Sequence, residues 1–449
     1  MTTEVEHWSP AAELDTGPAV PARPRLAVAY DVTSSSPLEL AAAVAGRWEL
    51  VWVVEADRPE LGPMGRLLPR LGTVVDVAGR SPRAVAESLR DHQLGGVVAF
   101  TDSQLQVAAL VADSLRLEGN PPDVVTALTD KGVQRRALGA AGIPVPAHVS
   151  LPAGSSPSDI QALVGALRYP VVVKPRRGSS SRGVSVVGGP DQLLAVLEPG
   201  AGADAVPDED RLAEEWLGDA APPVAGLGNY VSVEAVAQRG MIVPLAITGK
   251  FPTTAPCRET GNFMPHPLTR SAAEQVLDLA VRSAAALGVR SGALHIEIKL
   301  TPEGPRIIEI NGRVGGGGID LLYEARHGRA LTEIAARVAL GERLDLQPES
   351  PDPSGGPYRF AYYAQPPVDA TRVVALVGMD GAAALDGVTS VSVNRGVGDI
   401  IDPTEGSQGY VASFVGTADT LEELACVPTT IEAVLDVGYE RRDGGRPPS

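Results

Sequence analysis

The chain has 449 residues, 44% of them hydrophobic, and a formal net charge of −17 at pH 7. This length predicts about three domains with sizeable cores, and the acidic balance argues against a binding surface for nucleic acid or anionic membranes. Cys257 and Cys426 lack paired metal-ligand spacing and predict ordinary reduced thiols; no stretch approaches the length of a membrane span, so we expect a cytoplasmic protein.

Residues 1–24 are acidic and Pro-rich without an apolar core, which predicts a disordered extension rather than a signal peptide. The following part alternates short apolar runs, at 25–32, 49–54 and 96–100, with helix-like segments such as PLELAAAVAGRW. This alternation predicts a parallel α/β domain over residues 25–122.

From residue 123 the pattern changes. YPVVVKP (169–175), a Gly/Ser loop and GVSVVGG (183–189) predict an antiparallel strand-loop-strand unit within residues 123–200. Lys174 ends the first strand, and the loop adds Arg182 and a run of free backbone N–H groups, which can fold down on phosphate oxygens. A Gly/Ser loop is also common without any ligand, and neither GxxxxGK[ST] nor GxGxxG occurs in a suitable place.

Residues 201–345 begin with a low-complexity stretch and the segment LAEEWLGD. Strands are predicted at 229–238 and 241–250 and a helix near 271–288, and TEIAARVALG (332–341) closes this region. The tail, 346–440, starts Pro-rich and returns to strands and one helix, which predicts a small α+β subdomain.

The stretch 295–313, HIEIKLTPEGPRIIEINGR, predicts a hairpin whose strands flank the turn residues TPEGP. If the hairpin closes symmetrically about Glu303, Leu300 pairs with Arg306 and Glu297 lies directly opposite Glu309. Two carboxylates with Cβ atoms about 5 Å apart repel each other, so a divalent cation between them is the simplest explanation. Asn311 and Arg313 follow at a spacing of two and project from the same charged face.

The order of these segments resembles the ATP-grasp superfamily, and within it carboxylate-amine ligases similar to the L-amino-acid (dipeptide) ligases. LEGNPPDVVTALTDKGVQRRALGAAGIPVPAH, YPVVVKPRRGSSSRGV, EEWL, SVEAV and the hairpin carry the resemblance over residues 25–440. It implies an α/β protein of the α+β ATP-grasp type: a Rossmann-like domain (25–122), two lobes that clamp ATP between antiparallel sheets (123–200 and 201–345), and a C-terminal subdomain (346–440).

The same resemblance implies roles for individual residues. The ATP phosphates would be contacted by Lys131, Lys174 and a mobile lid made of Gly178, Ser179, Ser180, Ser181, Arg182 and Gly183. The hinge at the adenine would comprise Glu214, Glu215, Trp216 and Leu217, with the backbone of 215–217 reading the base edge. Two Mg²⁺ ions, replaceable by Mn²⁺, would be held by Glu297, Glu309 and Asn311. Arg313 would bind the substrate carboxylate and act in catalysis with Lys174 and Arg182.

The substrate side is less defined. Glu259 lies where similar ligases have a substrate loop and could hold the amino group of an acyl-donor amino acid, although a solvated surface Glu is the alternative. Asn262 stands near the place where such ligases often carry a His, which leaves the substrate open. Gly315 and Gly316 offer a bare wall to a substrate or only a flexible turn. The sequence assigns no definite role to Glu234 or His295.

The implied reaction is attack of a carboxylate on the γ-phosphate of ATP, followed by attack of an amine on the acyl phosphate. The partners are a small carboxylate and a small amine, not nucleic acid or membrane, and similar ligases are often homodimers. Two alternatives stay open. One is a bicarbonate-activating enzyme similar to biotin carboxylases, against which the ETGN loop counts. The other is a nucleotide-binding protein without catalysis, against which the intact metal set argues.

Overall fold

The computed structural model describes residues 24–32, 36–44, 46–197, 210–218, 220–352 and 355–442. The predicted N-terminal extension therefore lies outside the described residues, apart from Pro24, as does the low-complexity stretch up to residue 209. Within the described parts of the chain, no helix combines the length and the apolar character needed to cross a membrane.

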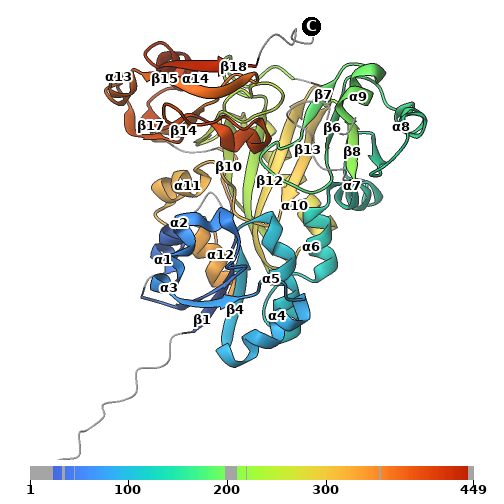
Figure 1. Ribbon diagram of the computed structural model, residues 1–449, viewed down its shortest axis with the longest axis vertical. Helices are drawn as coiled ribbons and strands as arrows, with labels where there is room; N and C mark the ends of the chain where they lie inside the picture. Colours follow the sequence, from blue (N-terminus) through green and yellow to red (C-terminus); the bar gives the residue numbers. More distant parts are fainter. Residues whose placement is uncertain are drawn as a thin grey trace, which may run out of the picture.

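The N-terminal part contains a four-stranded sheet in the order β3-β2-β1-β4, with parallel neighbours as predicted (Figure 1). Its strands are β1 (Arg25–Ala29), β2 (Glu49–Val54), β3 (Thr73–Asp76) and β4 (Leu94–Ala99). Its helices are α1 (Pro37–Val44), α2 (Gly62–Gly65), α3 (Leu68–Leu71), α4 (Pro82–Leu89) and α5 (Asp102–Leu115), with short 3-10 turns η1 (Pro59–Leu61) and η2 (Arg90–His92). β3 was not predicted because its only apolar residues are two half-buried valines.

Two helices, α6 (Pro122–Thr129) and α7 (Lys131–Ala140), lead into the small lobe. The small lobe is an antiparallel sheet in the order β5-β8-β6-β7 with α8 and α9 packed on it. The bounds are β5 (His148–Leu151), α8 (Pro157–Val164), β6 (Val171–Pro175), β7 (Ser185–Val187), α9 (Pro190–Leu197) and β8 (Arg211–Glu215). The predicted strand-loop-strand unit is confirmed as the β6–β7 pair.

The largest sheet has eight strands in the order β13-β12-β9-β10-β11-β14-β17-β16, and the paired neighbours are antiparallel. Its first strands are β9 (Tyr230–Gln238), β10 (Met241–Lys250), β11 (Gly261–Met264), β12 (Gly292–Thr301) and β13 (Gly304–Asn311). Helix α10 (Arg270–Ala286) packs on this sheet, and α11 (Ile319–His327) and α12 (Leu331–Ala339) pack between it and the N-terminal sheet.

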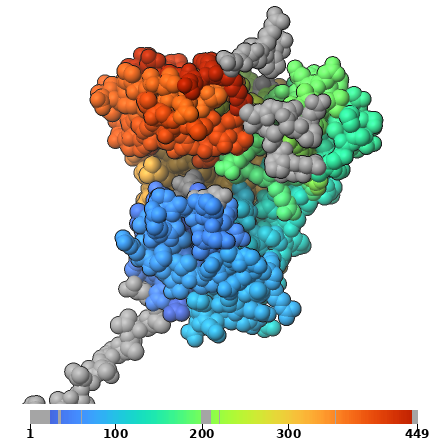
Figure 2. All heavy atoms as spheres, viewed as in Figure 1, coloured from blue at the N-terminus to red at the C-terminus, as the bar shows by residue number. Residues whose placement is uncertain are grey.

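The C-terminal part continues this sheet. Its strands β14 (Tyr358–Ala364), β16 (Val388–Val393) and β17 (Ala412–Ala418) extend the eight-stranded sheet beyond β11, whereas β15 (Ala370–Val377) and β18 (Asp436–Arg441) pair with each other. The described residues of this part form two α-helices instead of the predicted one: α13 (Met379–Ala383) and α14 (Leu421–Glu432). Figure 2 shows the C-terminal part and the small lobe as two masses above the N-terminal domain.

The β12–β13 hairpin closes differently from the prediction. Thr301 pairs with Gly304 and Leu300 with Pro305, so the turn has two residues rather than a symmetric centre at Glu303. Without a further irregularity, this one-residue shift at the turn would change every pair along the hairpin by one residue, and Glu297 would not lie opposite Glu309. A β-bulge after Ile298 inserts one extra residue in β13, and Glu297 therefore does pair with Glu309.

Helix α7 seals the free edge of β13. The Gln134 side chain donates to the Ile310 carbonyl (2.9 Å) and accepts from its N–H (3.0 Å), as a neighbouring strand would. Arg135 Nη2 donates to the carbonyl of Ile308, the bulged residue, at 2.5 Å. These contacts satisfy an otherwise open sheet edge and hold the start of α7, with Lys131, beside Glu309.

Candidate functional site

A cavity of about 480 Å³ lies between the small-lobe sheet and the eight-stranded sheet. Its volume is in the range of small-molecule sites. Most residues predicted as functional line it: Lys131, Lys174, Gly178, Ser179, Ser180, Ser181, Arg182, Glu214, Glu215, Trp216, Leu217, Glu259, Glu297, Glu309, Asn311 and Arg313. Three predicted residues are not among its lining residues: Gly183, Gly315 and Gly316.

The paired carboxylates of the hairpin each have a cationic partner. Lys131 Nζ lies 3.0 Å from Glu309 Oε1, and His295 Nε2 lies 3.4 Å from Glu297 Oε1. The expected repulsion between Glu297 and Glu309 is therefore offset by Lys131, which was expected at the ATP phosphates, and by His295, which was expected on the same strand face without a definite role. Their positions follow from α7, which packs on β13, and from alternation along β12.

The charges of this pair are stabilised by their surroundings. Burial alone would lower the pKa of His295, but the carboxylates of Glu234 and Glu297 outweigh it and raise the pKa to about 9. Burial alone would raise the pKa of Glu297, but the hydrogen bond from His295 and nearby cations hold it at about 2. Glu297 is thus ionised at neutral pH, as a ligand for a hard cation must be.

The protein groups at this wall would supply only part of a metal's coordination shell. The described residues contain no cluster of three or more His, Cys, Asp or Glu that could hold a metal on its own. Glu297, Glu309 and the Asn311 side chain supply a few oxygen ligands at the cavity wall. Mg²⁺ commonly takes few protein oxygens and completes its octahedron with phosphate and water, so this donor set fits Mg²⁺ in that setting.

Facing the hairpin, a buried ionic cluster lines the small-lobe side. Lys174 contacts Glu214, and Arg135 Nε donates to Glu214 Oε2 at 2.9 Å. Burial, the largest effect, lowers the pKa of Lys174, whereas the two cations outweigh burial and hold the pKa of Glu214 at about 2. Removing one member of such a cluster typically costs about 3–5 kcal/mol. Arg135 was missed, although its place four residues after Lys131 puts both on one helix face.

The Gly/Ser loop reaches over the cavity with an unusual backbone. Ser180 and Ser181 have φ of 59° and 57°, a left-handed conformation that costs energy in non-glycine residues. Lys131 Nζ donates to the Gly178 carbonyl at 2.7 Å, which ties the loop to α7. Arg182 lines the cavity and makes no ion pair with any described residue, so its guanidinium is available to an anion.

The predicted hinge differs in detail from expectation. The Glu215 N–H donates to the Ala147 carbonyl at 2.9 Å, and the Trp216 N–H donates to Pro170 at 3.0 Å. Neither can also donate to a base edge without losing its partner. Glu214 and Glu215 use their side chains in ion pairs with Arg135 and Arg168. Leu217 remains as the predicted hinge residue whose N–H could face a ligand.

Arg313 is held by the N-terminal domain. Its Nε donates to Asp102 Oδ2 at 2.9 Å and its Nη1 donates to the Val314 carbonyl at 3.1 Å. Nη2 has no hydrogen-bond partner among the described residues. Asp102, the first residue of α5, was missed in the sequence, yet an acid directly after a parallel strand is a recognisable signal because ligands gather at the carboxyl ends of such strands.

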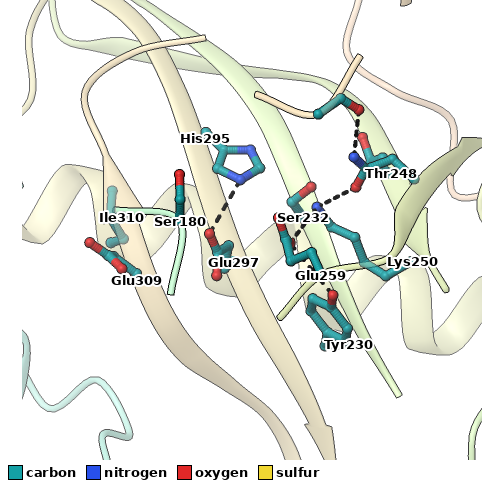
Figure 3. A network of polar contacts seen from close by, with 12 residues as sticks. Ser180, Tyr230, Ser232, Thr248, Lys250, Glu259, His295, Glu297, Glu309 and Ile310 are labelled. Atoms are coloured by element: carbon teal, nitrogen blue, oxygen red, sulfur yellow. Dashed lines mark hydrogen bonds and ion pairs between the residues drawn. The ribbon is translucent and has the colours of Figure 1, made fainter. Parts of the chain in front are cut away.

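A second polar group lies behind Glu259 (Figure 3). Lys250 is 1% exposed; its Nζ donates to Asn262 Oδ1 at 2.7 Å and lies 3.5 Å from Glu259 Oε1. The Tyr230 hydroxyl lies 3.5 Å from the same oxygen. Glu259 is thus a positioned, 31% exposed carboxylate rather than a fully solvated one.

Glu234 is buried and does not reach the cavity. It accepts from Ser232 Oγ (2.7 Å) and Thr248 Oγ1 (3.2 Å) and lies 2.9 Å from His295 Nδ1. These hydrogen bonds hold the Glu234 carboxylate beside His295, and Glu234 is not among the residues that line the cavity.

The glycines after Arg313 pack against this polar group. A Cβ on Gly315 would lie 2.7 Å from His295 Nδ1 and 3.0 Å from Glu234 Oε2. The Gly317 carbonyl accepts from Asn262 Nδ2 at 2.7 Å. Close backbone approach therefore accounts for Gly315 and Gly317, and the substrate contact of Gly315 and Gly316 stays a prediction.

Comparisons with known proteins agree with this geometry. Residues 167–320 match the model of the ATP-grasp domain family. The chain is 28% identical over 282 residues to carnosine synthase 1 of Mus musculus, covering 58% of this chain and 32% of that protein. It is 28% identical over 225 residues to D-alanine–D-alanine ligase of Cupriavidus metallidurans, covering 49% and 65%. The chain thus spans less than two thirds of either relative.

Among solved structures, the L-amino acid ligase from Bacillus licheniformis superposes with a TM-score of 0.72 at 17% identity, covering 94% of this chain and 100% of that one. At this identity the likeness shows the fold. Residues 167–320 therefore carry an ATP-grasp domain, and the chain as a whole shares the fold of that L-amino acid ligase.

Proposed function

We propose that the protein is an ATP-dependent carboxylate-amine ligase, which joins an amino-acid-like carboxylate to an amine through an acyl phosphate and releases ADP and phosphate. The observation that carries this proposal is the convergence of Lys174, the Glu297–Glu309 pair and Arg313 on one cavity between the two lobes. The ligases and synthase similar to this chain support the same reaction class.

ATP would lie with its base at the hinge and its phosphates between the lobes. The N–H of Leu217 would donate to the adenine edge, while Lys131, Lys174 and the Gly/Ser loop would bind phosphate oxygens. Two Mg²⁺ ions, or Mn²⁺ in their place, would be held by Glu297, Glu309 and Asn311 and would neutralise phosphate charge. His295 would keep the Glu297 carboxylate oriented.

Arg313 would align the acid with the γ-phosphate. Asp102 fixes the guanidinium, and Nη2 is left to bind the carboxylate and then the acyl phosphate. The carboxylate oxygen attacks phosphorus and ADP leaves; the amine nitrogen then attacks the carbonyl carbon, and the C–O bond to phosphate breaks. Charge stabilisation and alignment suffice for this chemistry, so no nucleophilic side chain is needed.

Glu259 would bind the ammonium group of an amino-acid acyl donor. Lys250 and Tyr230 hold one of its oxygens, which supports a fixed carboxylate at the substrate end of the cavity. We also propose a homodimeric assembly and a cytoplasmic location. The screen described next identifies the acid and the amine.

The test is a phosphate-release screen with Mg-ATP and pairwise pools of amino acids and amines, followed by mass spectrometry of the products. We expect phosphate release that requires both an acid and an amine, and a product whose mass equals their sum less one water. Phosphate release with one acid alone would instead indicate a kinase-like enzyme that forms an acyl phosphate, which water then hydrolyses, without coupling it to an amine. Turnover that requires bicarbonate and biotin would overturn the proposal.

A further inference from the structure

Three segments far apart in the sequence meet at Ser407, in the 3-10 segment η3 (Pro403–Gly409). The Ser407 N–H donates to the Ser180 carbonyl of the Gly/Ser loop at 2.8 Å. The Ser407 Oγ accepts from the N–H of Glu259 at 3.0 Å. Ser407 is 7% exposed, so both hydrogen bonds are shielded from water. One residue of the C-terminal part therefore contacts the phosphate side and the substrate side of the cavity.

Additional hydrogen bonds reinforce each side of this junction. Gln365 Nε2 donates to the carbonyls of Glu259 (2.7 Å) and Ser407 (2.9 Å). On the loop side, Gln408 Nε2 lies 3.4 Å from Ser180 Oγ. Both neighbours of the junction are thus held on η3 by more than one contact, and Ser181 Oγ also links the two loops directly by donating to the Cys257 carbonyl at 2.9 Å.

Gly406 shows how closely the loop lies against η3. Its backbone has φ 60° and ψ −129°, a conformation that L side chains rarely adopt. A Cβ at this position would lie 2.1 Å from the Ser180 carbonyl oxygen and 3.0 Å from the Arg182 nitrogen. Any side chain here must push the Gly/Ser loop away from the place where the structure holds it.

The η3 segment is itself firmly held. Arg395 Nη2 contacts both oxygens of Glu405 at 2.6 Å, and Asn394 Nδ2 donates to the Tyr410 carbonyl at 2.9 Å. Strand β17 of the eight-stranded sheet begins two residues later. By contrast, the Gly/Ser loop contains two strained residues, Ser180 and Ser181. We therefore expect the Gly/Ser loop, rather than η3, to move when the contact between them is disrupted.

We infer that Ser407 is a positioning residue that docks the Gly/Ser loop (178–183) and the Glu259 loop on the C-terminal part, so that the nucleotide side and the substrate side of the cavity are coupled. This inference rests on the proposed function for the meaning of the two sides, but the docking itself is a property of the protein without ligands. Coupling of this kind is reciprocal: whatever fixes Glu259 also favours the docked loop.

Limited proteolysis with trypsin tests the docking, because Arg182 is an exposed cleavage site within the loop. The variant Gly406→Ala should undock the loop and speed cleavage after Arg182, in the ligand-free protein, by roughly tenfold or more, since cleavage follows the population of the open loop. The matched control is Gly62→Ala: Gly62 has nearly the same backbone angles, φ 45° and ψ −132°, but a Cβ there meets nothing within 4 Å.

A double variant, Ser407→Ala with Gln408→Ala, removes the Oγ acceptor of the Glu259 N–H and the Gln408 contact with Ser180 without adding an atom, while the backbone N–H of Ser407 still donates to Ser180. We expect faster cleavage after Arg182 and weaker binding of a non-hydrolysable Mg-ATP analogue by calorimetry. Cleavage at the wild-type rate in a folded Gly406→Ala would overturn the inference; if Gly406→Ala does not fold, wild-type cleavage and wild-type analogue affinity in the double variant would overturn it. Because proteolysis needs no ATP, absence of nucleotide binding in the wild type would count against the proposed function alone.

Discussion

The ammonium of Lys131 lies 3.0 Å from Glu309 Oε1, so a residue predicted to bind phosphate neutralises a residue predicted to bind metal. The same ammonium donates to the Gly178 carbonyl at 2.7 Å. In the ligand-free protein Lys131 thus occupies a position between the carboxylate and the Gly/Ser loop. In the proposed function, a phosphate oxygen of Mg-ATP would replace Glu309 as the partner of Lys131 and leave the carboxylate to the cation.

This exchange predicts the effect of Glu309→Gln. The variant keeps the shape and loses the charge, so ADP formation at saturating ATP should fall by about a hundredfold or more, the order expected when several kcal/mol of charge stabilisation are lost. Steady-state ADP release measures this. Glu274→Gln, an exposed change on α10, is the control. Wild-type turnover by Glu309→Gln would contradict the assignment of this hairpin to the metal.

Asp102→Asn should loosen Arg313 without unfolding the site. A guanidinium displaced by about 1 Å from its working position can cost about a hundredfold in rate. We expect kcat with the acid to fall while the affinity for a Mg-ATP analogue changes little, and we expect Asp102→Glu to restore part of the loss. Asp113→Asn lies on the same helix and should have no effect. Equal losses in the Asn and Glu variants would point to a structural role instead.

Glu259→Gln separates substrate binding from nucleotide binding. If Glu259 binds an ammonium group, the KM for the acid should rise by about ten- to a hundredfold, the value of a hydrogen bond to a charged group, while the KM for ATP stays constant. Initial rates at varied acid and varied ATP give both constants. An unchanged KM for the acid would show that the acyl donor is recognised elsewhere.

The free energy of unfolding should depend on pH because of Glu349, which does not line the cavity. Burial raises the pKa of this carboxyl to about 7, above the usual 4.5. A raised carboxyl pKa contributes stability that is present below pH 4.5 and is lost as pH rises through 7. Glu349→Gln should therefore raise the melting temperature at pH 8 by a few degrees relative to the wild type, and by less at pH 5. Thermal scans at both pH values measure this, with Glu274→Gln as the control.

Much of the site could be predicted because its residues are close in sequence. Glu297, Glu309, Asn311 and Arg313 lie on one hairpin, and the Gly/Ser loop directly follows the strand that ends at Lys174. Alternation of apolar and polar residues assigns the faces of the hairpin strands without any knowledge of the rest of the fold. Even so, the Glu297–Glu309 pair depends on two features that were not predicted, a shorter turn and a compensating bulge.

The sequence by itself determined the element types, the order of the motifs and the chemistry of the hairpin, because these follow from local periodicity and from neighbours within a few residues. Only the tertiary structure decided which distant groups complete the site: Asp102 lies 211 residues before Arg313, and Ser407 lies 148 residues after Glu259. Such pairs leave no periodic signal. They exist because α12 packs the N-terminal sheet onto the eight-stranded sheet, and because β14 and β17 carry the C-terminal part to the rim of the cavity.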